Sequence, residues 1–148
     1  MPGILIRHGE WVVVCDGAKA LVLENVGNTK FPDLRTREVH EQKDPPTRAL
    51  GTDAPGRAMN SVGAVRSAVR QTDWHEQAER AFLEQLVARL DAAVTSGESR
   101  SFILAAPPRA LGTIRQLSPP AVRAAIRAEI DKDYVRLPVD EIKKHLVA

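Results

Sequence analysis

The sequence predicts a single α/β domain: a mixed β-sheet of about five strands with helices packed against it. Three observations lead to this prediction. The length of 148 residues suits one domain with its own core. Short apolar or alternating segments follow one another up to residue 42, as in an antiparallel meander. After residue 73, strand patterns and helix patterns alternate, as they do in the α/β half of a mixed fold. We therefore treat residues 1–148 as one domain.

The N-terminal part predicts three antiparallel strands. Residues 11–15 (WVVVC) are apolar and largely β-branched, which is typical of a buried strand. Asp16-Gly17 follows directly and indicates a hairpin, because glycine adopts the positive φ that such turns need. Residues 19–24 (KALVLE) form the returning strand. Residues 33–42 alternate weakly and predict a third, more exposed strand, which the prolines after it terminate.

A long loop over residues 44–73 is expected next, because this stretch has neither helical periodicity nor strand alternation. Asp73 then caps a helix over residues 75–96, and Glu76 completes the Asp form of a capping box. Apolar residues recur along this helix as one stripe, and Gly97 suits its C-terminal end.

The C-terminal half alternates strands and helices. Residues 101–106 (SFILAA) are apolar throughout, as in a strand covered on both faces, and the two prolines after them open a short helix. Residues 121–130 fit a helix face and an alternating strand equally well. We expect a helical turn first and a strand from about Arg127. Pro138 opens the last helix.

Catalytic, metal and cofactor sites are not predicted. The four histidines are scattered without the spacing of metal ligands, and no Walker A or Gly-x-Ser-x-Gly motif is present. Cys15 is the single cysteine, so it forms no intramolecular disulfide, and we expect a buried thiol. An enzyme that uses Asp53, His75 and Asp131 is the least favoured alternative.

The charge and the hydropathy of the sequence bear on three classes of partner: nucleic acids, membranes and other proteins. The net charge of +2 does not by itself indicate nucleic acid. No secretion signal and no apolar stretch of about 20 residues occurs, so we expect a cytoplasmic protein without membrane insertion. Residues 48–70 hold four arginines and one acid, which suits either a solvated loop or a surface that binds phosphate. RNA, a ribosome or another protein are the candidate partners.

Two groups of candidate binding residues follow. The first lies in the expected loop and at the helix start, where arginine suits phosphate and glycine lets the backbone approach a ligand. Its members are Arg48, Gly51, Thr52, Asp53, Gly56, Arg57, Arg66, Arg70 and His75. The second lies in turns near the sheet end, because ligands of open α/β sheets bind beyond the carboxyl ends of strands. Its members are Asp16, Gly17, Lys19, Pro107, Pro108, Arg109, Gly112, Asp131, Lys132 and Asp133.

Five segments carry a resemblance to a known family. They are residues 11–20 (WVVVCDGAKA), 48–57 (RALGTDAPGR), 67–75 (SAVRQTDWH), 105–112 (AAPPRALG) and 129–133 (EIDKD). Together they resemble the bacterial host attachment protein family, whose members are required for attachment to host cells. Lys19 stands where the family usually has Arg, and Tyr134-Val135 stand where Leu-Thr is usual. The resemblance implies a role in attachment, which a cytoplasmic location would make indirect.

The family is more distantly similar to the central domain of archaeal and eukaryotic peptide-chain release factors. This similarity implies a mixed sheet flanked by helices, with the long loop where release factors carry a Gly-Gly-Gln tip. That motif is absent here, so the resemblance does not imply peptidyl-tRNA hydrolysis. The first interpretation is therefore a non-catalytic, cytosolic binding protein. The alternative is a ribosome- or RNA-associated factor that uses Arg57, Arg66 and Arg70.

Overall fold

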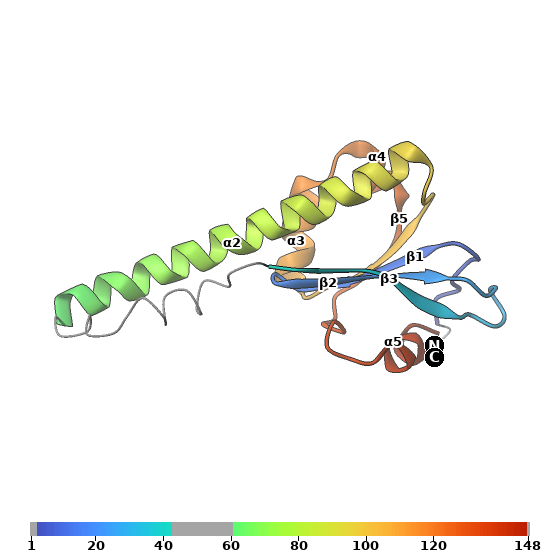
Figure 1. The fold of residues 1–148 in the computed structure, drawn as a ribbon, viewed down its shortest axis with the longest axis horizontal. Coiled ribbons are helices and arrows are strands. Elements are labelled where there is room, and N and C mark those ends of the chain that lie inside the picture. The colour runs from blue at the N-terminus through green and yellow to red at the C-terminus, as the bar shows by residue number, and fades with distance from the viewer. Residues whose placement is uncertain (1–2, 43–60, 148) are drawn as a thin grey trace.

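A five-stranded mixed sheet forms the centre of the fold (Figure 1). The computed structural model describes residues 3–42 and 61–147, with 61–73 as backbone only. The strands are β1 (Trp11–Cys15), β2 (Lys19–Asn25), β3 (Leu34–Glu41), β4 (Phe102–Ala105) and β5 (Ile126–Ile130). Their order is β3-β2-β1-β4-β5; β1, β2 and β3 pair antiparallel, whereas β1, β4 and β5 pair parallel. The predicted antiparallel meander and α/β half are therefore confirmed.

Helices cover both faces of this sheet. Those in the described part of the chain are α2 (Ser61–Ser96), α3 (Pro108–Leu117), α4 (Pro120–Ala125) and α5 (Val139–Val147). α2, α3 and α4 lie on one face, and α5 lies on the other (Figure 1). The side chains of β1 and β4 point alternately into the two resulting cores, so both strands are completely buried. This double burial explains why both read as continuous apolar runs.

Helix α2 begins earlier than the sequence predicts. It starts at Ser61, so the expected loop over residues 61–73 and the expected N-cap at Asp73 are both wrong. Residues 44–60 of that loop lie outside the described residues. No proline occurs between Pro55 and Pro107, so none interrupts the helix. Figure 1 shows the first part of α2 extending past the sheet, where packing does not demand the apolar stripe that marks a helix in a sequence.

The other boundaries follow the sequence closely. Gly97 has a φ of +83° and ends α2 as predicted. α4 ends at Ala125 and β5 begins at Ile126, which confirms a helical turn followed by a strand. Between its pairings of Ile126 with Phe102 and of Ala128 with Ile103, β5 carries one extra residue, Arg127. Such a bulge redirects a side chain away from the regular pleat.

Candidate functional site

The carboxyl ends of β1, β4 and β5 lie at one edge of the sheet, as their parallel pairing requires. We call this region the carboxyl edge. It comprises residues 16–19, 41–42, 74–79, 106–109 and 131–133. Figure 1 shows α2 leaving the sheet on this side. Ligands of open α/β sheets bind at such an edge, which makes it the candidate site.

Asp16 fixes the loop between β1 and β2. Its Oδ1 atom accepts hydrogen bonds from the N–H groups of Ala18 and Lys19, each at 2.8 Å. The Asp16 N–H donates to the Lys19 carbonyl oxygen at 3.0 Å. From the end of β3, the Gln42 side chain donates to the Gly17 carbonyl oxygen at 2.7 Å. The loop is therefore held by the protein's own polar groups.

Gly17 is needed because α2 comes close to the β1–β2 loop, and not because its backbone has a positive φ. Among the described glycines, positive φ occurs at Gly9 and Gly97, so the reason suggested by the hairpin pattern is wrong for Gly17. A Cβ atom at position 17 would lie 2.8 Å from two side-chain carbons of Glu79 on α2. The missing side chain lets α2 lie against the β1–β2 loop.

The loop after β5 adds carboxylates close to β1. Burial raises the pKa of the Cys15 thiol to about 12, and the negative charges of Asp16 and Asp133 contribute to the rise. Asp133 Oδ1 also accepts the Val135 N–H at 3.3 Å. The Cys15 side chain is fully buried and stays protonated at neutral pH, so the predicted core thiol is confirmed.

Carboxylates outnumber cations at the carboxyl edge. Arg109 on α3 pairs with Glu76 on α2 at 3.0 Å, and Lys19 pairs with Glu41 at 3.8 Å. The described edge holds six acids against three Lys or Arg residues. The acids are Asp16, Glu41, Glu76, Glu79, Asp131 and Asp133, and the bases are Lys19, Arg109 and Lys132. Among the described residues of the edge, this balance favours a cationic partner.

The structure brings most of the second predicted group together. Asp16, Gly17, Lys19, Pro107, Pro108, Arg109, Asp131, Lys132 and Asp133 all belong to the carboxyl edge, and Gly112 lies further along α3. The first group divides. Arg66 and Arg70 lie within α2 and not on a loop, and His75 is half-buried on the same helix. Arg48, Gly51, Thr52, Asp53, Gly56 and Arg57 lie outside the described residues.

A buried ion pair at the amino end of the parallel strands could not be found from the sequence. Glu10 is 3% exposed and accepts hydrogen bonds from Arg127 at 2.7 and 2.8 Å and from Ser101 at 2.5 Å. Burial alone would raise the pKa of Glu10, but these bonds and one from the Arg7 N–H lower it to about 2. In the sequence, the only sign of this pair is a single acid, Glu10, directly before an apolar strand. Its partner Arg127 lies 117 residues further along the chain.

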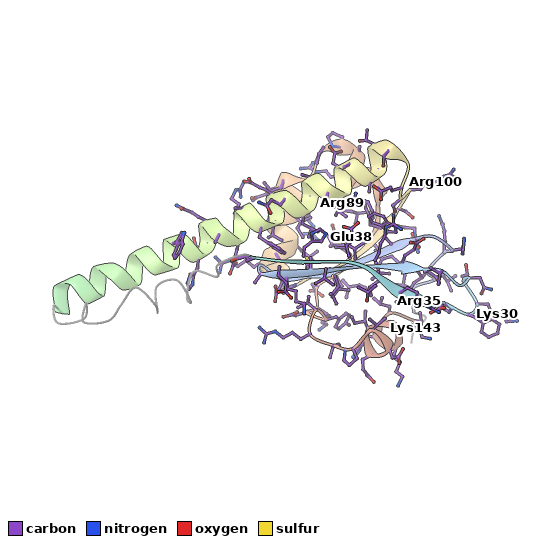
Figure 2. All side chains as sticks on the ribbon, viewed as in Figure 1. Lys30, Arg35, Glu38, Arg89, Arg100 and Lys143 are labelled. Atoms are coloured by element: carbon purple, nitrogen blue, oxygen red, sulfur yellow. The ribbon has the colours of Figure 1, made fainter. Side chains whose placement is uncertain are left out.

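A network of ion pairs covers Trp11 on the α2 face. The Arg37 and Arg89 guanidinium carbons lie 4.9 and 5.5 Å from the centroid of the Trp11 ring. Both arginines bind Glu98, at 3.0 and 2.9 Å, and their hydrogen bonds lower the pKa of Glu98 to about 2. Arg89 also pairs with Glu38 at 2.5 Å, between α2 and β3 (Figure 2). These cations are therefore used to join α2 to the sheet.

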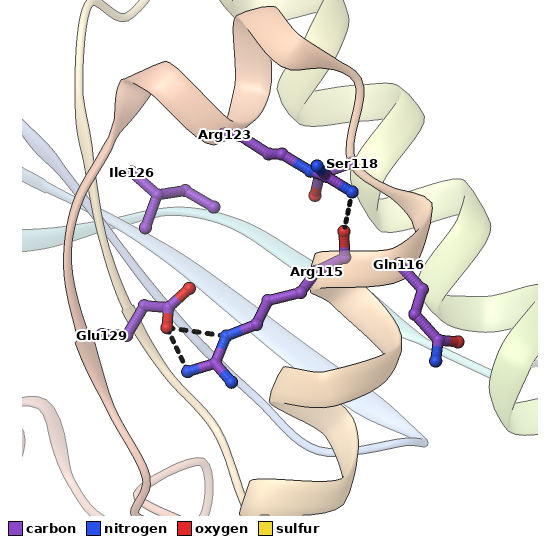
Figure 3. A pocket seen from close by; sticks show the side chains of 6 residues that line it. All are labelled: Arg115, Gln116, Ser118, Arg123, Ile126 and Glu129. Atoms are coloured by element: carbon purple, nitrogen blue, oxygen red, sulfur yellow. Dashed lines mark hydrogen bonds and ion pairs between the residues drawn. The ribbon is translucent and has the colours of Figure 1, made fainter.

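A cavity of about 420 Å³ lies between α3, α4 and β5 (Figure 3). Arg115 donates to Glu129 Oε1 from Nε at 2.9 Å and also from Nη2. Arg123 donates to the Arg115 carbonyl oxygen at 2.9 Å, at the C-terminal end of α3. Arg115 and Glu129 therefore bind each other and Arg123 binds the backbone, which suits a junction between elements better than a ligand site.

Two kinds of feature are absent from the described part of the chain. Nowhere in it do three or more His, Cys, Asp or Glu side chains gather as a metal ion would require. No helix there combines the length and the apolar character needed to cross a membrane.

Comparison with protein families gives a match over nearly the whole chain. The family model described as "Protein required for attachment to host cells" matches residues 11–146. The match begins with β1 and ends within α5, so it includes the sheet and the carboxyl edge. No curated protein matches the chain.

Proposed function

Because the chain belongs to the family of proteins required for attachment to host cells, we propose that it supports attachment as a non-catalytic binding protein. The carboxyl edge is the proposed binding surface. The observation that carries this proposal is the charge of the edge, where six carboxylates stand against three Lys or Arg residues. Such a surface attracts a cationic partner, for example a basic segment of another protein. Trp74, which is 39% exposed on α2, belongs to this edge and offers an apolar contact within it.

The polar groups of the edge favour binding over catalysis. The Asp16 carboxylate accepts two backbone N–H groups, and the Asp133 carboxylate accepts one. The Arg109 guanidinium pairs with Glu76, and the Cys15 thiol is buried with its pKa raised to about 12. A general base or nucleophile must direct a lone pair at a substrate. The two aspartates instead hold loops in place, Arg109 joins α3 to α2, and the Cys15 thiol lies in the core.

Charge reversal at the edge tests the proposal. Asp131→Lys with Glu76→Lys replaces one acid that has no ion pair with a described residue and one acid paired with Arg109. In a deletion strain, this double variant should fail to restore attachment to host cells. The strain carrying the wild-type chain should attach normally.

A matched control lies on the opposite face of the sheet. Asp140→Lys with Glu141→Lys on α5 also reverses one acid without an ion pair to a described residue and one paired with a lysine. This variant should restore attachment, and thermal unfolding should show that both variants fold. Equal attachment by the two variants would overturn the carboxyl edge as the binding surface.

The proposed role is cytoplasmic, and its effect on attachment is therefore indirect. Protease treatment of intact bacteria tests this part. The chain should be protected until the cells are lysed. Cleavage on intact cells would contradict an indirect role and would favour direct contact with the host.

A ribosome- or RNA-associated factor is the alternative function. It depends on Arg57, Arg66 and Arg70, whereas the described residues of the carboxyl edge carry more acids than bases, which does not attract phosphate. Sedimentation of lysate through a sucrose gradient at low and high salt separates the two functions. A position at the top of the gradient in both conditions supports a protein partner. Salt-sensitive migration with ribosomes supports the alternative, because phosphate contacts weaken as salt rises.

A further inference from the structure

The amino end of the parallel strands contains a second cavity, whose charge differs from that of the carboxyl edge. It measures about 420 Å³ and is lined by residues 7–10 and 97–101. Both carboxylates in its wall are neutralised by arginines from elsewhere. Glu10 pairs with Arg127 at 2.7 Å, and Glu98 pairs with Arg37 and Arg89 at 3.0 and 2.9 Å. The acids of this cavity therefore leave its other cations unneutralised.

Arg7 and Arg100 are those other cations. Both line the cavity, and both are exposed. Neither side chain has an acidic partner among the described residues, unlike Arg115 in the cavity beside β5, which pairs with Glu129. Figure 2 shows Arg100 at the end of the molecule away from the projecting part of α2. Two guanidinium groups at one cavity suit an anion with several oxygens, such as a phosphate ester.

The turn between β2 and β3 adjoins this cavity. His8 Nδ1 lies 2.6 Å from the Gly27 carbonyl oxygen, which ties the cavity wall to the turn. The turn is fixed by Asn25, whose side chain is fully buried. Its Nδ2 donates to the Ile6 carbonyl oxygen at 2.9 Å, and its Oδ1 accepts the Gly27 and Asp33 N–H groups, both at 2.9 Å. The turn is therefore an ordered part of the fold.

This ordered turn presents apolar side chains to water. Phe31 is 70% exposed and Val26 is 45% exposed. The Lys30 ammonium lies 5.8 Å from the Phe31 ring centroid. An aromatic ring left in water gains no hydrophobic free energy on folding, so the Phe31 ring is available to an apolar layer outside the protein. Figure 1 shows that the turn projects from one end of the sheet.

We propose that this end of the molecule docks peripherally on an anionic phospholipid surface. Arg7 and Arg100 take a headgroup phosphate in the cavity, and Phe31 enters the interfacial layer. Aromatic side chains favour that layer, and cations close to an anionic leaflet are attracted to it. A projecting tip with two apolar side chains buries little area against a folded protein. A lipid surface, in contrast, adapts to such a tip. The contact stays at headgroup depth and needs no spanning helix.

Vesicle co-sedimentation tests the proposal. The purified chain should sediment with phosphatidylcholine vesicles that contain phosphatidylglycerol, and not with phosphatidylcholine alone. Arg7→Ala with Arg100→Ala should lower the affinity roughly tenfold or more, and added salt should weaken binding further. Phe31→Ser should lower the affinity severalfold, because the ring loses its place in the interface.

Matched controls distinguish binding by this surface from the general effects of losing an apolar side chain or positive charge elsewhere on the protein. Val39→Ser removes an apolar side chain that is 53% exposed on β3, and Lys132→Ala with Arg136→Ala removes two exposed cations that follow β5. Both should bind vesicles like the wild type. No sedimentation with anionic vesicles, equal sedimentation with neutral vesicles, or an equal loss in the controls would overturn the proposal. So would binding of soluble glycerol phosphate through Arg7 and Arg100 without any vesicle binding.

Discussion

The two ends of the parallel strands use carboxylates in opposite ways. At the amino end, Glu10 is 3% exposed and lies among arginine and hydroxyl donors that lower its pKa to about 2. At the carboxyl end, Asp131 and Glu76 are exposed, and Asp16 is only half-buried. The same type of side chain therefore stabilises the fold at one end and remains accessible at the other. Burial, and not residue identity, separates the two roles.

Removing the buried carboxylate should have the largest effect. Glu10→Ala removes the acceptor of the Ser101 hydroxyl and of the Arg7 N–H, and it leaves the Arg127 guanidinium with the Leu5 carbonyl oxygen but without a carboxylate. Because the Arg127 side chain is 29% exposed, water compensates in part. We expect the free energy of unfolding to fall by about 3 kcal/mol in urea denaturation. Asp16→Ala at the other end should cost about 1 kcal/mol, the value of ordinary hydrogen bonds. Equal losses would break the comparison.

The pH dependence of stability should sharpen the same contrast. The pKa of Glu10 is about 2 in the folded chain, compared with an ordinary value of 4.5, which we take for the unfolded chain. A carboxyl with a lowered folded pKa stabilises the fold above its unfolded pKa, and this contribution disappears as the pH falls from 4.5 towards about 2. Over that range the wild type should lose up to about 3 kcal/mol more than Glu10→Gln.

Urea unfolding of the wild type and Glu10→Gln at a series of acidic pH values provides the measurement. The pKa of Glu98 is also lowered to about 2. Its titration is present in both proteins, so it cancels from the difference between them. Parallel curves for the two proteins would mean that Glu10 does not titrate in this window.

The sheet was predictable because its central strands are buried on both faces. That burial leaves continuous apolar runs in β1 and β4, which are visible without any structure. The start of α2 was not predictable from the sequence, because a helix carries an apolar stripe only where it packs against the rest of the protein. The first part of α2 extends past the sheet. Asp73 resembles an N-cap in the sequence, although it lies within this helix.

The candidate site was predictable only where strand ends supply it. Asp16, Arg109 and Asp131 follow directly from the rule that parallel strands end at a common edge. Glu76 and Glu79 reach the same edge through the path of α2 across the sheet, which no local pattern encodes. The cavity at the amino end depends on contacts between residues 7–10 and 97–101, which are distant in the sequence.

Two glycines, one near each end of the parallel strands, extend the comparison to steric effects. Of the two substitutions by alanine, the one at Gly27 should lower the stability more. A Cβ atom there would lie 2.3 Å from the Phe31 carbonyl oxygen and 2.8 Å from the Asp33 nitrogen. Both are backbone atoms that cannot rotate away, so Gly27→Ala must open the turn. We expect a loss of about 2 kcal/mol in urea denaturation, as for other overpacked sites. Unchanged stability would show that the turn adapts freely and does not present Phe31 in a fixed position.

Gly17→Ala should have the smallest effect on stability. Its Cβ atom would lie 2.8 Å from the Cγ and Cδ atoms of Glu79, and that side chain can rotate away from the loop. The Asp16 carboxylate would still accept the Ala18 and Lys19 N–H groups, so the loop should keep its conformation. We expect a loss below about 1 kcal/mol in urea denaturation and unchanged amide exchange at both N–H groups. A loss as large as that of Gly27→Ala would mean that contact between α2 and the loop supports the fold. The carboxyl edge would then be as rigid as the amino end, and accessibility alone would distinguish the two.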